Sequence, residues 1–221
     1  MSGTLYVVAT PIGNLGDITL RAVEILKTVA AVVCEDTRVT QKLLQHYGID
    51  KPLCSYHHHS TDKVTNGLVD RLRAGESLAY VTDAGTPGVA DPAGKLVAAA
   101  AVSDIPIVPI PGVSAVTTIL SVAGINLQEF VFLGYPPHKK GRVKFFNEVV
   151  ASSKPVVFYE STYRINKALF ELEKLAPSKK LIVGRELTKK FETIYRGTPA
   201  EVLAALQQTS TLGEFVIVVA P

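Results

Sequence analysis

The chain has 221 residues, of which 47% are hydrophobic and 19% are charged, with eight tyrosines and eight phenylalanines. This composition can build a substantial core and excludes general disorder, and the length allows one large domain or two small ones. The formal net charge of +3 favours an anionic partner only slightly, far less than the dense basic face of a dedicated nucleic-acid-binding domain would.

The cysteine content and the N-terminus indicate the compartment. Cys34 and Cys54 are the two cysteines, and Cys34 lies in the apolar run 29–34, so we expect a reduced protein without a disulfide framework. The N-terminus lacks the basic region of a signal peptide. No stretch reaches the roughly twenty continuous apolar residues that span a bilayer. The sequence therefore predicts a cytoplasmic protein with no membrane partner.

The first predicted strand, residues 5–9, is followed by a glycine loop at 10–17 and by apolar residues at helical spacing from 18 to 29. Asp17 or Thr19 can cap this helix by accepting a bond from an early backbone amide. The loop matches neither the P-loop pattern nor G-x-G-x-x-G, so the sequence gives little support to a nucleotide site here.

The next apolar run ends in Glu35-Asp36-Thr37-Arg38, before a helix predicted at 39–47. One interpretation is that one acid caps the helix and the other pairs with Arg38. The alternative is that one acid faces a cleft, where it binds hydroxyls or accepts a proton. The sequence alone leaves both interpretations open.

Three consecutive histidines, His57 to His59, suggest a metal site at first sight. Consecutive residues in an extended segment point to alternating sides, so three in a row do not easily converge on one ion. We therefore expect no metal here, and favour a loop contact to substrate. An amphipathic helix is predicted at 62–72.

A glycine- and proline-rich loop, residues 82–88, lies between a predicted strand at 78–81 and a predicted helix at 93–101. Asp91-Pro92 closes it. Gly85 and Gly88 permit positive φ, and ligands of open α/β sheets collect at the carboxyl ends of strands. An ordinary tight connection and a binding loop are both compatible with this stretch.

A strand at 105–110 and a small-residue helix at 114–123 complete the first half. The order β, α, β, α, α, β, α, β, α predicts a doubly wound, mostly parallel sheet. We predict two α/β domains, an N-terminal one at residues 1–112 and a C-terminal one at 113–221.

The second half is predicted to form a mixed sheet with helices, because its strands at 130–135, 156–160, 181–184, 192–196 and 215–219 include hairpin-like neighbours. The basic loop 136–142 is a candidate phosphate contact. Charged residues also gather beyond the strand ends, either as an ion-pair network or as a site. They are Glu160, Arg164, Arg185, Glu186 and Lys189.

Six motifs follow one another along the chain: Thr10-Pro11-Ile12-Gly13-Asn14-Leu15, Glu35-Asp36-Thr37-Arg38, Asp83-Ala84-Gly85-Thr86-Pro87 with Asp91-Pro92, Pro111-Gly112, Phe158-Tyr159-Glu160-Ser161 and Arg185-Glu186-Leu187-Thr188-Lys189. In this order they resemble the ribosomal RNA small subunit methyltransferase I family of the tetrapyrrole methylase superfamily. The resemblance covers nearly all of the chain.

The resemblance implies an enzyme that uses S-adenosylmethionine, releases S-adenosylhomocysteine and methylates the ribose 2′-hydroxyl of a cytidine in the decoding region of small-subunit ribosomal RNA. It also implies a cofactor cleft between two α/β domains, and a homodimer. The modest charge favours an assembled RNA-protein surface over free RNA as substrate, and no DNA partner is expected. Because the sulfonium donor loses its charge during transfer, no metal is expected.

The resemblance implies cofactor contacts at Pro11, Asp83, Ala84, Gly85, Thr86, Pro87, Gly88, Val89, Ser114, Ala115, Tyr159 and Arg185. Candidate bases are Asp36, Glu160, Glu35 and Glu186, with Asp36 or Glu160 favoured because each follows a strand end. Predicted RNA phosphate contacts are Arg38, Lys139, Lys140, Arg142, Arg164 and Lys189. Tyr163 or the 57–59 loop could stack on a base.

Two departures from the family pattern concern the cofactor loop: Thr82 replaces a serine, and Ala93 replaces a glycine. Ala93 puts the local backbone conformation in question. The sequence ends at Pro221, whereas many relatives carry a further C-terminal segment that could contact RNA. Two other functions remain open: a tetrapyrrole methyltransferase, and a non-catalytic cofactor-binding module in ribosome assembly.

Overall fold

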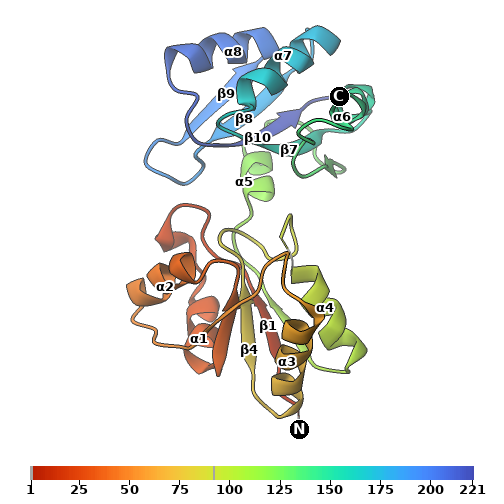
Figure 1. Ribbon diagram of the computed structural model, residues 1–221. Coiled ribbons are helices and arrows are strands. Elements are labelled where there is room, and N and C mark those ends of the chain that lie inside the picture. The colour runs from red at the N-terminus through yellow and green to blue at the C-terminus, as the bar shows by residue number, and fades with distance from the viewer. Residues whose placement is uncertain (1, 92) are drawn as a thin grey trace. The chain divides into compact units, whose positions relative to one another are not determined.

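A computed structural model describes residues 2–91 and 93–221 (Figure 1). Pro92, part of the predicted closing turn, lies outside the described residues. The chain divides into two compact units, Met1–Ser114 and Ala115–Pro221. Within the described residues, no helix has the length and apolar character needed to cross a membrane.

The first unit is built on a parallel five-stranded sheet with the order β3-β2-β4-β1-β5. Its strands are β1 (Leu5–Val8), β2 (Ala31–Cys34), β3 (Leu53–Ser55), β4 (Leu78–Val81) and β5 (Ile107–Ile110). Its helices are η1 (Leu15–Asp17, a 3-10 turn), α1 (Leu20–Thr28), α2 (Thr37–His46), α3 (Asp62–Arg73) and α4 (Ala93–Val102). The predicted doubly wound parallel sheet is confirmed.

Helices cover both faces of this sheet, with α1 and α2 on one side and α3 and α4 on the other (Figure 1). Successive strand residues point to opposite faces, so β4 supplies both cores. Leu78 and Tyr80 pack in the cluster that includes Leu72 and Leu96. Ala79 and Val81 pack in the second cluster, on the opposite face of the sheet. A strand buried on both faces has no polar alternation, which is why these runs are continuously apolar.

Strand β3 was missing from the predicted order. It has three residues and is partly exposed, and among the described strands it pairs with β2 alone, at the sheet edge. Such a short edge strand carries too little apolar pattern to be predicted. Thr19 caps α1 by accepting a hydrogen bond from the Ala22 amide, which confirms one of the two expected caps.

The second unit contains a mixed sheet with the order β6-β7-β10-β8-β9, in which β6 and β7 are parallel and the other pairs antiparallel. Its strands are β6 (Val131–Phe132), β7 (Val156–Ser161), β8 (Leu181–Arg185), β9 (Thr193–Gly197) and β10 (Glu214–Val219). Its helices are α5 (Ala115–Ser121), α6 (Arg142–Ala151), α7 (Ile165–Leu175) and α8 (Pro199–Gln208). The predicted mixed sheet is confirmed, although β6 is much shorter than expected and α6 was not predicted.

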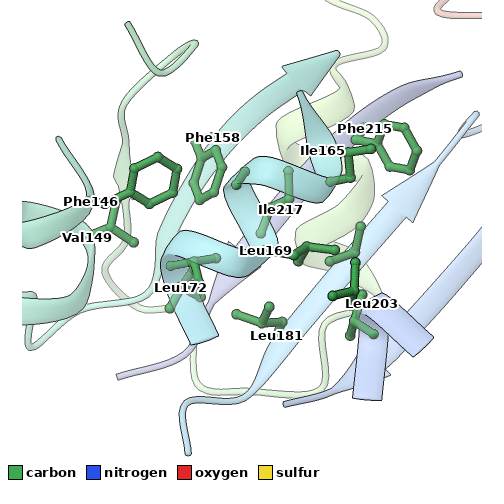
Figure 2. Close-up of a cluster of buried hydrophobic side chains, with 14 of the residues drawn as sticks. Phe146, Val149, Phe158, Ile165, Leu169, Leu172, Leu181, Leu203, Phe215 and Ile217 are labelled. Carbon is green, nitrogen blue, oxygen red and sulfur yellow. The ribbon is translucent and has the colours of Figure 1, made fainter. Parts of the chain in front are cut away.

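The main core of this unit joins α6, α7 and α8 to one face of the sheet (Figure 2). Phe146 and Phe158 meet edge to face at 5.9 Å between ring centroids. Helix α5 contacts β8 and β10 on the opposite face. Gly184 permits this approach, because a Cβ there would lie 3.0 Å from Ile119 Cδ1.

Phe158→Ala should lower the free energy of unfolding of this unit by about 3–5 kcal/mol, because the ring is fully buried and its loss leaves a cavity. Urea denaturation followed by circular dichroism measures the change. Phe170→Ala is the matched control, since Phe170 is 54% exposed on α7. Equal loss in both variants would contradict the core placement.

Candidate active site

The loops that follow β1 and β4 are bonded to each other. Thr10 N–H donates to the Gly85 carbonyl at 3.0 Å, and Gly85 N–H donates to the Thr10 carbonyl at 2.9 Å. Thr10 Oγ1 also donates to the Thr82 carbonyl at 3.0 Å. Gly85 has φ +85°, a conformation that glycine adopts without steric cost. The predicted cofactor loop therefore begins on a fixed scaffold.

Asp91 holds the far end of the same loop. Its carboxylate accepts hydrogen bonds from Gly88 N–H at 2.6 Å and from Ala93 N–H at 2.8 Å. Ala93 is buried at the start of α4, so its Cβ is accommodated in a helical conformation. The residue with an unusual backbone is Ala90, with φ +73°.

Several groups of this loop are already engaged, and others are open. Thr86 Oγ1 donates to the Val113 carbonyl at 3.0 Å. Within residues 2–91 and 93–221, the backbone amides of Ala84 and Thr86 have no protein acceptor. Free amides beside a left-handed glycine are suited to acceptor atoms of a ligand. The loop could hold a cofactor through its backbone.

Glu35 lies beside this loop because β2 and β4 are neighbours in the sheet. Thr82 Oγ1 donates to Glu35 Oε1 at 2.9 Å. Burial raises the pKa of Glu35, and the charges of Asp83 and Asp91 raise it further against the opposing effect of the Thr82 hydrogen bond. A carboxylate with a raised pKa is a stronger base toward a hydroxyl proton.

Asp36 has the opposite environment. It caps α2 by accepting from the Arg38 amide at 2.8 Å, and it pairs with the Arg38 guanidinium at 2.6 Å. Its own amide donates to Asp83 Oδ1 at 3.1 Å. The hydrogen bonds from Arg38 lower the pKa of Asp36 to about 2. Asp36 thus takes both roles that the sequence divided between the two acids, helix cap and partner of Arg38, and this environment makes it a poor base.

Glu160, the other favoured base, lies in a buried ion cluster of the second unit. Its Oε1 is 2.9 Å from Arg164 Nε and its Oε2 is 3.5 Å from Arg142 Nη1. Arg142 also donates to Glu171 Oε2 at 2.8 Å. Both Glu160 and Arg142 are at least 97% buried. This geometry favours a structural role over the predicted catalytic role of Glu160 and the predicted phosphate contact of Arg142.

Glu186 and Arg185 are also engaged within their own unit. Glu186 Oε1 accepts from Lys189 Nζ and from the Glu214 amide, each at 2.9 Å. Burial raises the pKa of Glu186, but the hydrogen bond and charge of Lys189 outweigh it, so the pKa is lowered overall. Arg185 donates to the Leu212 carbonyl at 2.6 Å. These contacts match the ion-pair network that the sequence left open.

The remaining predicted residues lie as follows. Pro11 directly follows the Thr10 bridge, and Tyr159 packs its ring against Tyr135 and Phe132. Lys139 and Lys140 are exposed in the loop before α6. No three His, Cys, Asp or Glu side chains of the described chain are grouped like metal ligands.

The sequence reasoning missed Thr82 as the partner of Glu35. The signal was available in principle, because a doubly wound order that places β2 beside β4 brings the residues after both strands together. Alternation of strands and helices along the sequence does not by itself give that strand order.

Comparison with known proteins places the chain in a family. A profile of the Tetrapyrrole (Corrin/Porphyrin) Methylases matches residues 4–203. Ribosomal RNA small subunit methyltransferase I of Xylella fastidiosa is 43% identical over 221 residues, which cover 98% of this chain and 81% of that protein. The chain belongs to the ribosomal RNA small subunit methyltransferase I family. The Synechocystis relative of the same name is 42% identical, over 99% of this chain and 79% of its own length.

Solved structures agree in fold. A cobalt precorrin-4 methyltransferase superposes with a TM-score of 0.72 at 17% identity, covering 98% of this chain and 94% of that one. A diphthine synthase superposes with a TM-score of 0.75 at 14% identity, covering 99% and 90%. At these identities the likeness concerns the fold alone. Membership of the small subunit methyltransferase I family makes the protein a methyltransferase.

Glu160→Gln should lower the free energy of unfolding by about 3–5 kcal/mol, because it leaves two buried or half-buried guanidinium groups without their shared carboxylate. Thermal and urea denaturation measure the change. Glu148→Gln, at an exposed position on α6, is the control and should change stability little. Unchanged stability together with lost methyl transfer would restore the catalytic role of Glu160.

Proposed function

We propose that this methyltransferase transfers a methyl group from S-adenosylmethionine to the ribose 2′-hydroxyl of a cytidine in the decoding region of small-subunit ribosomal RNA. The names of its relatives support the RNA class, and the motif resemblance supports the nucleoside and the position. The chemistry rests on one observation: Glu35, a carboxylate with a raised pKa, lies beside a loop with open backbone amides.

The residues of the β4–α4 loop fit the cofactor. The amides of Ala84 and Thr86 can donate to its acceptor atoms, and the carboxylate of Asp83 can accept from its hydroxyl or ammonium groups. When bound, S-adenosylmethionine supplies the methyl group from a sulfonium centre. Asp91 and the Thr10 bridge keep the loop in one shape, so little ordering entropy is lost on binding.

Glu35 is proposed as the group that removes the hydroxyl proton. Its Oε1 is held by Thr82, which leaves Oε2 to accept the proton from the ribose. Because the sulfonium loses its charge as the bond forms, the protein has mainly to align the reacting atoms, exclude water and hold this proton. Thr82 is a positioning residue, since it fixes the carboxylate without touching the ribose.

We propose that the substrate is an assembled small ribosomal subunit. We also propose that the chain acts on it as a homodimer in the cytoplasm. Lys139 and Lys140 are the predicted phosphate contacts that remain exposed without a described ion-pair partner. Two lysines and a net charge of +3 give modest attraction to RNA, so recognition of ribosomal protein surface would have to contribute.

Glu35→Gln should lower kcat by about 10²- to 10⁴-fold, the contribution typical of a positioned base, with the Kd for S-adenosylmethionine unchanged. Asp36→Asn is the matched control and should keep kcat within about tenfold, because its low pKa makes it a poor base. Turnover is measured with labelled S-adenosylmethionine and unmodified small subunits, followed by mapping of the labelled nucleotide. Cofactor binding without any transfer by the wild-type protein would instead support the non-catalytic assembly module.

The assignment of Glu35 as the base also predicts how kcat/KM depends on pH. A base must be deprotonated to act, so kcat/KM should rise with pH through the pKa of Glu35, which lies above the ordinary glutamate value of 4.5. Above that pKa the rate should level off. Asp36→Asn should keep this acid limb and Glu35→Gln should lose it. An identical limb in both variants would assign the titration to another group.

A further inference from the structure

One edge of the second unit's sheet brings three loops together. Strands β7 and β8 end there, and β9 and β10 begin there, because Ser161 pairs with Glu214 and Arg185 pairs with both Phe215 and Thr193. The loops at this edge are residues 162–164, 186–192 and 209–213.

Each of these loops exposes one large apolar side chain. Tyr163 is 95% exposed, Phe191 63% and Leu212 67%. We call these three side chains the three-loop patch. Single exposed hydrophobic residues are ordinary on protein surfaces, but three on neighbouring loops at one end of a sheet make that end a candidate binding surface.

Part-buried hydrogen bonds hold the backbone of the three loops together. Arg185, 9% exposed, donates to the carbonyl of Leu212 at 2.6 Å and to the carbonyl of Phe191 at 3.4 Å. Thr162 Oγ1 and Gly213 exchange hydrogen bonds of 2.6 and 2.7 Å. One guanidinium and one hydroxyl therefore tie all three loops to each other.

The middle loop is also strained. Glu186 and Thr188 have φ values of +51° and +65°, in the left-handed region that residues with a Cβ seldom adopt. Strain of this kind persists only where the surroundings impose it, and it is concentrated at binding and catalytic sites. The loop is thus held in one shape at some cost in stability, while Phe191 is left in solvent.

The chemistry beside Phe191 is suited to a nucleotide. Lys190 Nζ lies 5.5 Å from the Phe191 ring centroid. Within the described residues, no carboxylate is within ion-pair distance of Lys190. An aromatic face next to an uncompensated cation can stack on a base and contact its phosphate.

We propose that the three-loop patch binds unpaired nucleotides of the RNA substrate, with Phe191 and Tyr163 stacking on bases and Lys190 contacting phosphate. This inference rests on the proposed RNA substrate. Charged Lys189 and Glu192 lie in the 186–192 loop and Glu214 begins β10, so this end of the sheet mixes apolar rings with charges. Stacking on single bases needs only separate ring faces, whereas a protein partner would need a continuous apolar area. Leu212 supplies an apolar wall beside the stacked bases.

The test compares Phe191→Ala and Tyr163→Ala with Phe191→Trp, using unmodified small subunits as substrate. Each alanine variant should raise KM by about 5- to 150-fold, the typical loss per stacked base, with kcat at saturation and the Kd for S-adenosylmethionine unchanged. The tryptophan variant should restore KM. Phe170→Ala, an exposed aromatic on α7, is the control and should leave KM unchanged. Lys190→Gln should reduce the salt slope of log(kcat/KM) by about one.

Thermal melting of each variant shows whether it is folded, and KM is compared only among folded variants. If both folded alanine variants keep the wild-type KM, the three-loop patch does not bind the substrate. That result would leave the proposed methyl transfer unaffected. A changed sedimentation coefficient with an unchanged KM would also overturn it, in favour of contact between copies of the chain. Failure of the wild-type protein to methylate small-subunit RNA would overturn the proposed function itself.

Discussion

Parallel strand pairing is the constraint on which the candidate site depends. In a parallel sheet all carboxyl ends reach the same edge, so the residues after β1, β2 and β4 become neighbours although they are far apart in sequence. Thr10, Thr82 and Glu35 then form one chain of hydrogen bonds across that edge.

The candidate acids show how environment separates identical chemical groups. Glu35 is desolvated beside two other carboxylates, whereas Asp36, the next residue, faces an exposed guanidinium and a helix N-terminus. Glu160 is buried between two arginines. Removing either partner of such a pair leaves an uncompensated buried charge, which is strongly destabilising, so this carboxylate has a structural task where it lies. Position after a strand end is therefore not enough to identify a base.

The sequence predicted the parallel and mixed sheets because their strands are continuous apolar runs bounded by glycine, proline or charge. It failed at β3 and α6, where burial depends on neighbours: β3 pairs only at an edge, and α6 begins with the buried charge of Arg142. For the site, the loop at 82–88 was recognisable from its glycines and prolines. The pairing of Thr82 with Glu35 was not, since it depends on strand order.

Arg185 binds the main-chain carbonyls of residues 191 and 212, while the side chains of both residues are largely exposed. Substitutions at these two positions therefore need not disturb the scaffold, whereas a change in length of either loop would pull a carbonyl out of reach. Relatives could thus vary the side chains at these two positions while the underlying frame stays fixed. The same separation offers two positions whose side chains can be engineered without redesigning the fold.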